Sequence, residues 1–330
     1  MELFIPTYYH GFRCIAAACP DSCCHEWTVD IDPETAARYR ALEGALGDRL
    51  RSVLQDTEYG TCMTIENGRC PMWQQDGLCR IHAQLGHDAL SQTCRDFPRL
   101  RHDYGDFVEL GLELSCPEAA RLILSNDSHF LPQALPGGTE PEYEPEIMEI
   151  LRSSRKEALC YLRTAPRLPR ALAALLLYAH SVQAQLDGDP EPVPAPEICE
   201  AQLEQFQLQG DATLLPDFFS KLEILTDRWK KRLSDPLQPI VWSTELRRLT
   251  CYFIERYWLQ AISDYDLVCR VKLAVAGTLL VGYLGGSIIE TAQLFSKEIE
   301  NDPDNLEAVL DGAYTAQAFT DANLLGVLLS

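Results

Sequence analysis

Nine cysteines lie within the first 116 residues of this 330-residue chain, and thiols at such density are typical of a few kinds of chemistry. A thiolate can bind a metal, attack a substrate as a nucleophile, or exchange with a disulfide. The other four cysteines are scattered: Cys160, Cys199, Cys251 and Cys269. Three of those four lie in apolar, helix-like contexts and are predicted to be small core residues.

Eight of the early cysteines are predicted on loops and at the ends of elements, where several sulfurs can turn toward one point. They are Cys14, Cys19, Cys23, Cys24, Cys70, Cys79, Cys94 and Cys116. Cys19 and Cys23 are separated by three residues, which fits the short pairs of a zinc site. The longer spacings favour an iron–sulfur cluster, because its larger core accepts thiolates from distant segments.

Eight thiols can serve two four-thiolate sites, or one site with several structural bystanders. The side chains of the adjacent residues Cys23 and Cys24 point in different directions in an extended chain. The two thiols can therefore bind two different metal centres, or one of them can stay unligated. Zinc, and structural or redox thiols without a metal, remain alternatives to iron–sulfur. A Cys–His nucleophile involving His25, His82 or His87 would leave seven clustered cysteines unexplained.

The elements that must position these thiols are short and irregular over residues 1–130. Residues 32–54 are the clearest helix, with Asp32 as its cap and Pro33 at its first position. Residues 61–67 and 107–114 are predicted to be short strands. In residues 107–114, apolar side chains alternate with other residues, as in a strand with one buried face. Residues 79–94 between them are predicted to carry one short helix.

Prolines, glycines and glutamates gather over residues 131–146, which we interpret as a linker or a long surface loop. Residues 147–330 then read as a helical domain, with strong helical patterns at 170–186, 215–233, 244–262 and 265–284. The sequence therefore predicts a mainly α protein: an irregular cysteine-rich, metal-binding domain at 1–130 with short strands, followed by an α-helical C-terminal domain.

The net charge of −21 argues against a nucleic-acid binder, because such proteins need a basic face along the phosphates. The apolar stretch 273–289 is interrupted by glycines, so we expect a buried helix rather than a transmembrane segment. The first residues, MELFIPTYYHGF, show neither the basic region nor the apolar run of a signal peptide. We therefore expect a cytoplasmic protein whose thiols are reduced.

Three blocks of the sequence resemble the flagellin lysine-N-methylase family. They are FRCIAAACPDSCCHEWTVDID, CPMWQQDGLCRIHAQLGHDALSQTCRDFPR and LELSCPEAARLIL, which together run from Phe12 to Leu124. That family is in turn related to zinc- or iron-chelating proteins with a CxxCxxCC-type motif. The helical half is compatible in length but carries no diagnostic motif.

The resemblance implies a protein-lysine N-methyltransferase that acts on flagellin or a similar protein with S-adenosylmethionine, and that holds an iron–sulfur cluster of the 4Fe–4S type. It implies ligands among the eight cysteines already named, while Cys62 falls outside the pattern and is predicted to be structural. A non-catalytic metal-carrying or sensing module and an iron–sulfur redox protein are the alternatives.

The residues by themselves do not indicate methyl transfer. The nearest match to a glycine-rich cofactor turn, Glu43–Asp48, lies inside a helical pattern without a preceding strand, so we reject it. The catalytic residues are unknown from the sequence. Candidates for lining a pocket near the thiols are Tyr8, Tyr9, His25, Asp30 and Asp32, and Arg95 and Arg99 are candidates for balancing thiolate charge.

Overall fold

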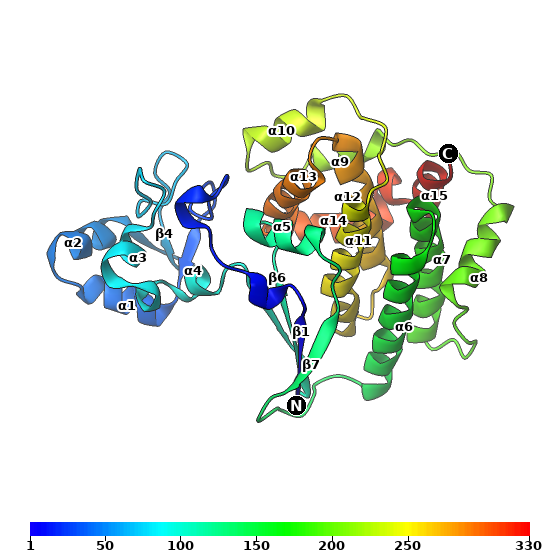
Figure 1. Ribbon diagram of the computed structural model, residues 1–330, viewed down its shortest axis with the longest axis horizontal. Helices are drawn as coiled ribbons and strands as arrows, with labels where there is room; N and C mark the ends of the chain where they lie inside the picture. Colours follow the sequence, from blue (N-terminus) through cyan, green and yellow to red (C-terminus); the bar gives the residue numbers. More distant parts are fainter.

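The computed structural model describes all 330 residues and contains fifteen α-helices and seven short strands, so the mainly α prediction is confirmed. Figure 1 shows a small lobe at one side of a larger helical body, with the strands of a narrow sheet between them. We call residues 13–98 the cysteine-rich lobe, and residues 1–12 with 99–330 the helical body.

The cysteine-rich lobe combines a three-stranded antiparallel sheet with short helices around a core of 11 buried residues. The sheet order is β2-β4-β3. The elements are β2 (Val29–Ile31), α1 (Pro33–Ala41), α2 (Gly44–Val53), β3 (Leu54–Thr57), β4 (Gly60–Met63), α3 (Arg80–Leu85) and α4 (Gln92–Asp96). Long loops separate them, and these loops carry most of the thiols.

The helix predicted over residues 32–54 begins as expected but is divided in two. The Asp32 carboxylate accepts a hydrogen bond from the backbone N–H of Thr35 at 3.0 Å, and Pro33 opens α1. α1 ends at Ala41, and α2 starts at Gly44, whose φ of +80° favours glycine. The leucine repeat continued through this turn, which is why the pattern alone predicted one helix.

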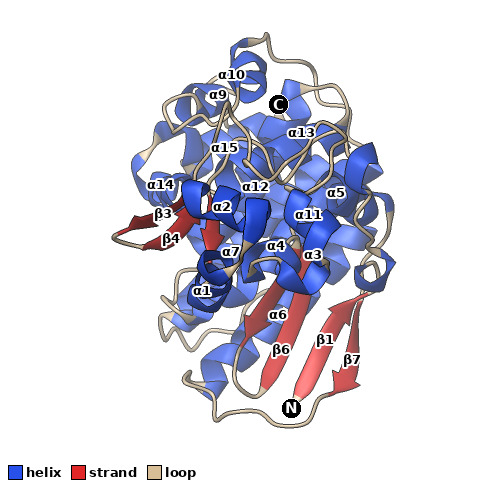
Figure 2. Ribbon diagram, turned by 90° about the vertical axis from the view of Figure 1, so that its left-hand side faces the viewer, coloured by secondary structure: helices blue, strands red, loops and turns tan.

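A four-stranded sheet of order β5-β6-β1-β7 belongs to the helical body. Its strands are β1 (Glu2–Pro6), β5 (Arg99–Asp103), β6 (Phe107–Leu112) and β7 (Phe130–Ala134). β1 runs parallel to β6 and antiparallel to β7, with Glu2 opposite Phe107 and Ala134. A parallel pair needs a long crossover, and the whole cysteine-rich lobe lies in that crossover. Figure 2 shows β6, β1 and β7 in a row below the lobe.

The strand prediction for residues 107–114 is confirmed by β6, whereas of residues 61–67 only the first part is strand. Residues 79–94 hold α3 and the start of α4 rather than one helix. The predicted linker, 131–146, begins inside β7 and ends inside α6, which starts at Pro145. The division into domains at 1–130 and 147–330 stays a prediction.

The helical body has a continuous core of 64 buried residues, built mainly from long helices. Its helices are α5 (Pro117–Ser125), α6 (Pro145–Thr164), α7 (Leu168–Leu186), α8 (Pro196–Gln202), α9 (Leu214–Phe219), α10 (Asp227–Ser234), α11 (Thr244–Tyr257), α12 (Val268–Leu284), α13 (Ile288–Phe295), α14 (Pro303–Thr315) and α15 (Asp321–Leu329). α12 is buried along nearly its whole length, as expected for the apolar stretch. None of the helices is both long and apolar enough to cross a membrane.

The single helix predicted over residues 215–233 is wrong, because α9 ends at Phe219 and α10 begins at Asp227. The backbone between them bonds to neighbouring side chains instead of continuing a helix. The N–H of Leu225 donates to Glu298 at 2.8 Å, and the N–H of Glu223 donates to Asn305 at 3.0 Å. These partners are distant in sequence, so local periodicity does not reveal them.

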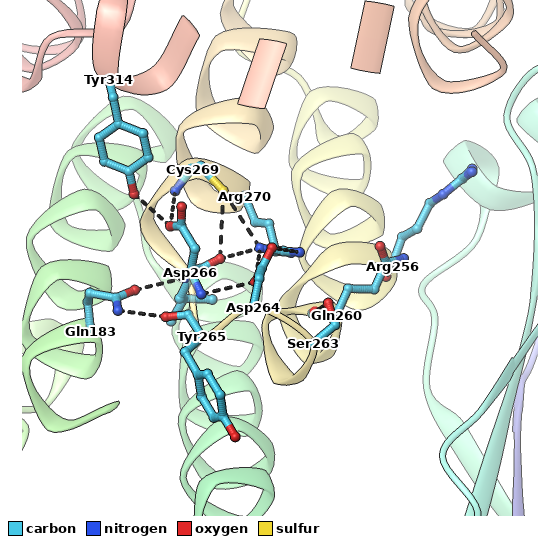
Figure 3. A network of polar contacts seen from close by, with 11 residues as sticks. Gln183, Arg256, Gln260, Ser263, Asp264, Tyr265, Asp266, Cys269, Arg270 and Tyr314 are labelled. Carbon is cyan, nitrogen blue, oxygen red and sulfur yellow. Dashed lines mark hydrogen bonds and ion pairs between the residues drawn. The ribbon is translucent and has the colours of Figure 1, made fainter. Parts of the chain in front are cut away.

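The turn that leads into α12 is held by a polar network (Figure 3). The Asp266 carboxylate accepts hydrogen bonds from the Cys269 backbone N–H at 3.2 Å and from the Tyr314 hydroxyl at 2.6 Å. Arg270 pairs with Asp264 through two contacts of 2.8 and 2.9 Å. The network therefore caps α12 and ties it to α14.

Candidate functional site

Three of the predicted ligand cysteines, Cys70, Cys79 and Cys94, lie near Cys24, and we call these four residues the Cys24 group. Hydrogen bonds from the thiols of Cys23 and Cys70 lower the pKa of Cys24, and the same hydrogen bonds raise the pKa of each donor. Burial raises the pKa of Cys94 to about 11, and the charges of Cys24 and Cys79 add to this effect. These mutual effects place the four sulfurs within range of one another's charge.

A second set, Cys14, Cys19 and Cys116, lies beside the first, and we call it the Cys14 group. Burial raises the pKa of Cys116 to about 11, and the charges of Cys19 and Cys14 raise it further. Cys23 stands between the groups, because both Cys94 and Cys14 raise its pKa in addition to its hydrogen bond with Cys24. Adjacent residues of the doublet thus face different neighbours.

The metal site predicted from the sequence is not confirmed by the side-chain positions. No group of three or more His, Cys, Asp or Glu side chains is placed so that it could hold a metal ion. The donor chemistry does fit a thiolate-held centre, because all thirteen cysteines are free and four of them gather around one thiolate. Cys62 is buried in β4 outside both groups, beside Asp30 and Asp56.

A cleft of about 360 Å³ separates the cysteine-rich lobe from the helical body, and we call it the interlobe cleft. Its lobe wall contains Cys23, Cys94, Trp27 and Phe97. The two aromatic rings meet edge to face, with centroids 5.8 Å apart. Cys23 and Cys94 are exposed to solvent, and both line the cleft. The thiols and the aromatic rings therefore border the same space.

The body wall of the cleft is acidic, with Glu113 after β6 and Glu300 at the end of the turn that follows α13. Burial raises the pKa of Glu113, while the positive charge of Arg256 opposes that shift. The Glu300 carboxylate accepts a hydrogen bond from the Tyr257 hydroxyl at 2.8 Å and lies 3.4 Å from the Arg256 guanidinium. The Glu300 side chain is fully buried in this pair, so a cation entering the cleft would meet the partly exposed Glu113 and two aromatic rings.

Residues Ser296–Glu300 form a π-helical turn that continues α13, and this turn faces the lobe. Such turns are rare and often occur at functional sites. The buried Lys297 ammonium lies 2.8 Å from Glu26 and 3.1 Å from Asp21, and 5.1 Å from the centre of the Trp27 ring. Lys297 outweighs the effect of burial on Asp21 and lowers the pKa of that carboxyl. This contact fixes the Cys19–Cys23 loop against the helical body.

The pocket candidates named from the sequence do not converge on the interlobe cleft. Tyr8 is buried in the body, where burial raises its pKa and the Glu255 charge adds to the effect. Tyr9 is half-buried, and Asp30 is exposed on β2. His25 packs against Trp73, with ring centroids 5.5 Å apart. None of these four lines the cleft.

Asp32 acts as a helix cap. Its carboxylate accepts hydrogen bonds from the backbone N–H groups of Gln92 and Thr35, and these lower its pKa to about 2. Arg95 donates to the backbone carbonyl of Asp88 at 3.2 Å, and Arg99 lies over the Phe12 ring at 5.1 Å. Neither arginine forms an ion pair with a carboxylate.

Sequence reasoning missed Glu113, Lys297 and Glu300. One signal was available: the charged run from Lys297 to Glu300 directly follows an apolar helix, and three of its four residues are charged. Charged residues that continue a buried helical pattern attract attention, because a buried charge requires a partner. Glu113 carried no such signal, since it alternates with leucines on a predicted strand.

Two groups of free thiols lie beside a cleft with aromatic and acidic walls in a two-lobed, mainly α-helical protein. In sequence, the chain is 30% identical over 168 residues to the flagellar biosynthetic protein FliU of Salmonella muenchen, covering 47% of this chain and 95% of FliU. It is 34% identical over 131 residues to the lysine-N-methylases of Salmonella typhimurium and Salmonella choleraesuis, covering 37% of this chain. That match spans 32% of the length of each lysine-N-methylase.

The chain belongs to the family of FliU and these lysine-N-methylases, which is the family that its cysteine blocks resemble. No family model matches the chain. No solved structure matches it either. The relation to CxxCxxCC-type chelating proteins stays a prediction.

Proposed function

We propose that this protein transfers methyl groups from S-adenosylmethionine to lysine side chains of flagellin or a similar protein, and that its cysteines hold an iron–sulfur centre. Membership of a family that includes proteins named lysine-N-methylase supports the reaction class. The observation that carries the proposal is the interlobe cleft, which combines aromatic walls with two carboxylates beside the thiols.

The cleft suits a lysine side chain on physical grounds. Its volume of about 360 Å³ is at the low end for ligand sites, as expected for one extended side chain. Trp27 and Phe97 offer faces for the four methylenes and for a cation–π contact with the ammonium. Glu300 is held by Tyr257 and Arg256 in the wall of the cleft, and the partly exposed Glu113 is the carboxylate that a lysine side chain can reach.

Methyl transfer requires a neutral amine, because an ammonium has no lone pair. We assign Glu113 as the group that accepts the ammonium proton, since it lines the cleft and hydrogen-bonds with the Ser115 hydroxyl at 3.2 Å. The lysine nitrogen then bonds to the methyl carbon, the carbon–sulfonium bond breaks, and its electron pair returns to sulfur. S-adenosylhomocysteine and methyl-lysine are the products, and Glu113 releases its proton to solvent.

The Cys24 group, with Cys23 and the Cys14 group beside it, would hold the iron–sulfur centre. Such a centre supplies one-electron redox chemistry when bound. Cys23 and Cys94 also line the interlobe cleft, so ordering of these thiols would order the cleft wall. Lys297 holds the loop between Cys19 and Cys23 through Asp21 and so positions the same wall.

The test is anaerobic purification, followed by measurement of iron, sulfide and zinc and by transfer of labelled methyl groups to flagellin. We expect iron and sulfide, and label on lysines. Glu113→Gln should lower kcat by about a hundredfold, as for loss of a general base, and Trp27→Ala should raise KM for flagellin. Glu149→Gln and Trp242→Ala, which lie outside the cleft, are the matched controls.

Three results contradict the proposal in different ways. A zinc-only protein would remove the iron–sulfur part, and unchanged kcat in Glu113→Gln would remove the assigned base. Iron and sulfide without any methyl transfer to lysine would favour a metal-carrying or redox protein instead.

A further inference from the structure

A second polar cavity, of about 230 Å³, is lined by residues of α5, α6 and α11 in the helical body. Three arginines line it: Arg163 near the end of α6, and Arg247 and Arg248 in the first turns of α11. We call it the arginine cavity. In a chain with a net charge of −21, three arginines around one cavity are a local concentration of positive charge.

The charges in the arginine cavity do not cancel. Arg163 lies 2.8 Å from the Glu255 carboxylate, and Arg248 lies 2.9 Å from Asp127. Arg247 has no carboxylate partner and donates to the backbone carbonyl of Leu162. A planar guanidinium with spare donors is suited to bind a carboxylate through two parallel hydrogen bonds.

The cavity also presents negative charge a short distance from that arginine. The Asp127 side chain is 72% exposed, so its carboxylate can still reach a ligand. Glu255 is only 5% exposed, and burial raises its pKa to about 7 against the charges of Arg163 and Arg155. A site with one free guanidinium and adjacent carboxylates complements a ligand that carries both an anionic and a cationic group.

A smaller chamber of about 20 Å³ adjoins the arginine cavity, since Tyr252 and Glu255 line both. Two buried atoms at this chamber, Nε2 of His102 and Nε of Arg256, have no hydrogen-bond partner. Buried polar atoms are nearly always satisfied, so these two indicate a place where a polar group or a water binds. The polar surface therefore continues inward from the arginines.

The arginine cavity shares a wall with the interlobe cleft. The Tyr252 hydroxyl lies 3.3 Å from Glu300, which lines the cleft, while the Tyr252 side chain lines the arginine cavity. At about 230 Å³ the cavity is smaller than the roughly 300–1,000 Å³ of a site that encloses a drug-sized ligand. It suits one end of a larger molecule.

We propose that the arginine cavity binds the α-amino carboxylate of an amino-acid-bearing ligand, with Arg247 on the carboxylate and Asp127 on the ammonium. This inference rests on the proposed function in one respect: the ligand is then the methionyl end of S-adenosylmethionine. The same chemistry is present in free methionine, so the experiment compares the two sources.

The test measures binding to the full-length protein by calorimetry, with S-adenosylhomocysteine as the unreactive probe. The matched probe is 5′-methylthioadenosine, which has the nucleoside but no amino-acid group. We expect the wild-type protein to prefer S-adenosylhomocysteine, and Arg247→Gln to weaken its binding by about ten- to a hundredfold, as for loss of a charged hydrogen bond. Binding of 5′-methylthioadenosine should stay unchanged, which also shows that the variant is folded.

Two further variants sharpen the result. Arg247→Lys keeps the positive charge but loses the planar pair of N–H donors. Its affinity for S-adenosylhomocysteine should therefore fall between those of the wild type and Arg247→Gln. Arg170→Gln removes an arginine that pairs with Glu200 and Glu204 elsewhere, so it should leave binding unchanged. Equal affinity of wild type and Arg247→Gln for S-adenosylhomocysteine overturns the site and leaves the proposed function intact.

Failure of the proposed function looks different. If the wild-type protein binds neither S-adenosylmethionine nor S-adenosylhomocysteine, the methyl-transfer proposal fails. Free methionine then tests the cavity alone: binding that depends on Arg247 supports an amino-acid site, and absence of binding overturns it.

Discussion

The cysteine-rich lobe and the helical body solve the problem of stability in different ways. The body buries 64 residues in one hydrophobic core, whereas the lobe buries 11 around a small sheet and short helices. A core of the smaller size supplies little stabilisation by itself, which is why small domains commonly add metals or disulfides. The lobe has no disulfide, and its cysteines are free thiols.

This contrast suggests a division of roles. The body offers a rigid surface on which carboxylates and arginines are held by buried partners, such as the ion pair of Arg155 with Glu109. The lobe offers long loops that carry free thiols and are tied to the body through Lys297. The interlobe cleft takes one wall from each region.

The largest expected loss of stability comes from a substitution in the core of the helical body. Trp258 is 1% exposed, stacks on Tyr178 and donates to the Ser154 hydroxyl at 3.1 Å. Trp258→Ala should reduce the free energy of unfolding by about 3–5 kcal/mol, through lost burial and a cavity. Chemical denaturation followed by far-UV circular dichroism measures it. Trp242→Ala, at a partly exposed position, should change stability by less than about 0.5 kcal/mol; similar losses in both variants would contradict the assignment of the core.

A smaller effect is expected for the corresponding change in the lobe. Met72 is fully buried in the lobe core. Met72→Ala should cost about 2–3 kcal/mol, toward the low end for such changes because a small core can partly collapse. The loss should appear in lobe-specific signals, such as exchange of the β4 amide hydrogens, while the body melts at an unchanged temperature. Met148→Ala in the body is the matched variant, and it should show the opposite pattern.

The contact between the two regions is tested by Lys297→Met. Removing the ammonium leaves Asp21 and Glu26 without their partner, and we expect a loss of about 2 kcal/mol, below the value for a fully buried pair because Glu26 is 39% exposed. The lobe should also become more sensitive to proteolysis. Lys221→Met, at an exposed position, controls for loss of charge. Unchanged protection of residues 14–24 would show that other contacts hold the lobe.

The smallest expected effect concerns the contribution of Asp32 to the pH dependence of stability in the lobe. The pKa of Asp32 is lowered from 3.8 to about 2, so its ionised form stabilises the fold above pH 4, and this contribution is lost as the pH falls through about 2. Asp32→Ala should cost about 1 kcal/mol at pH 7 and remove that dependence. Asp32→Asn keeps a cap without titrating. Acid titration of stability by denaturant melts compares the three proteins; parallel curves would exclude Asp32 as the source.

Much of the helical body was predictable because its long helices carry apolar periodicity, as in residues 170–186, 244–262 and 265–284. The errors fall where distant partners decide the backbone. Residues 220–226 read as helix from composition, but Glu298 and Asn305 bind their backbone N–H groups. The cap at Asp32 was predictable because capping is local chemistry.

The candidate site was only partly predictable. The thiols stood out by density, and the structure brings Cys24, Cys70, Cys79 and Cys94 together from segments that are up to 70 residues apart. The acidic wall was not found, because Glu113 and Glu300 look like ordinary surface residues until the sheet and α13 bring them to one cleft. Arg247 was missed for the same reason, since nothing in a helix pattern tells which arginine lacks a carboxylate.

The order of strands in the four-stranded sheet has a consequence for synthesis. β1 leaves the ribosome first, but its hydrogen-bonding partners Phe107 and Ala134 are added more than a hundred residues later. At about 5–20 residues per second, the strand waits roughly 5–20 seconds with its edges unpaired. Residues 13–98 of the lobe all lie between β1 and β6, so the small core of the nascent lobe can assemble before the sheet closes around its two ends.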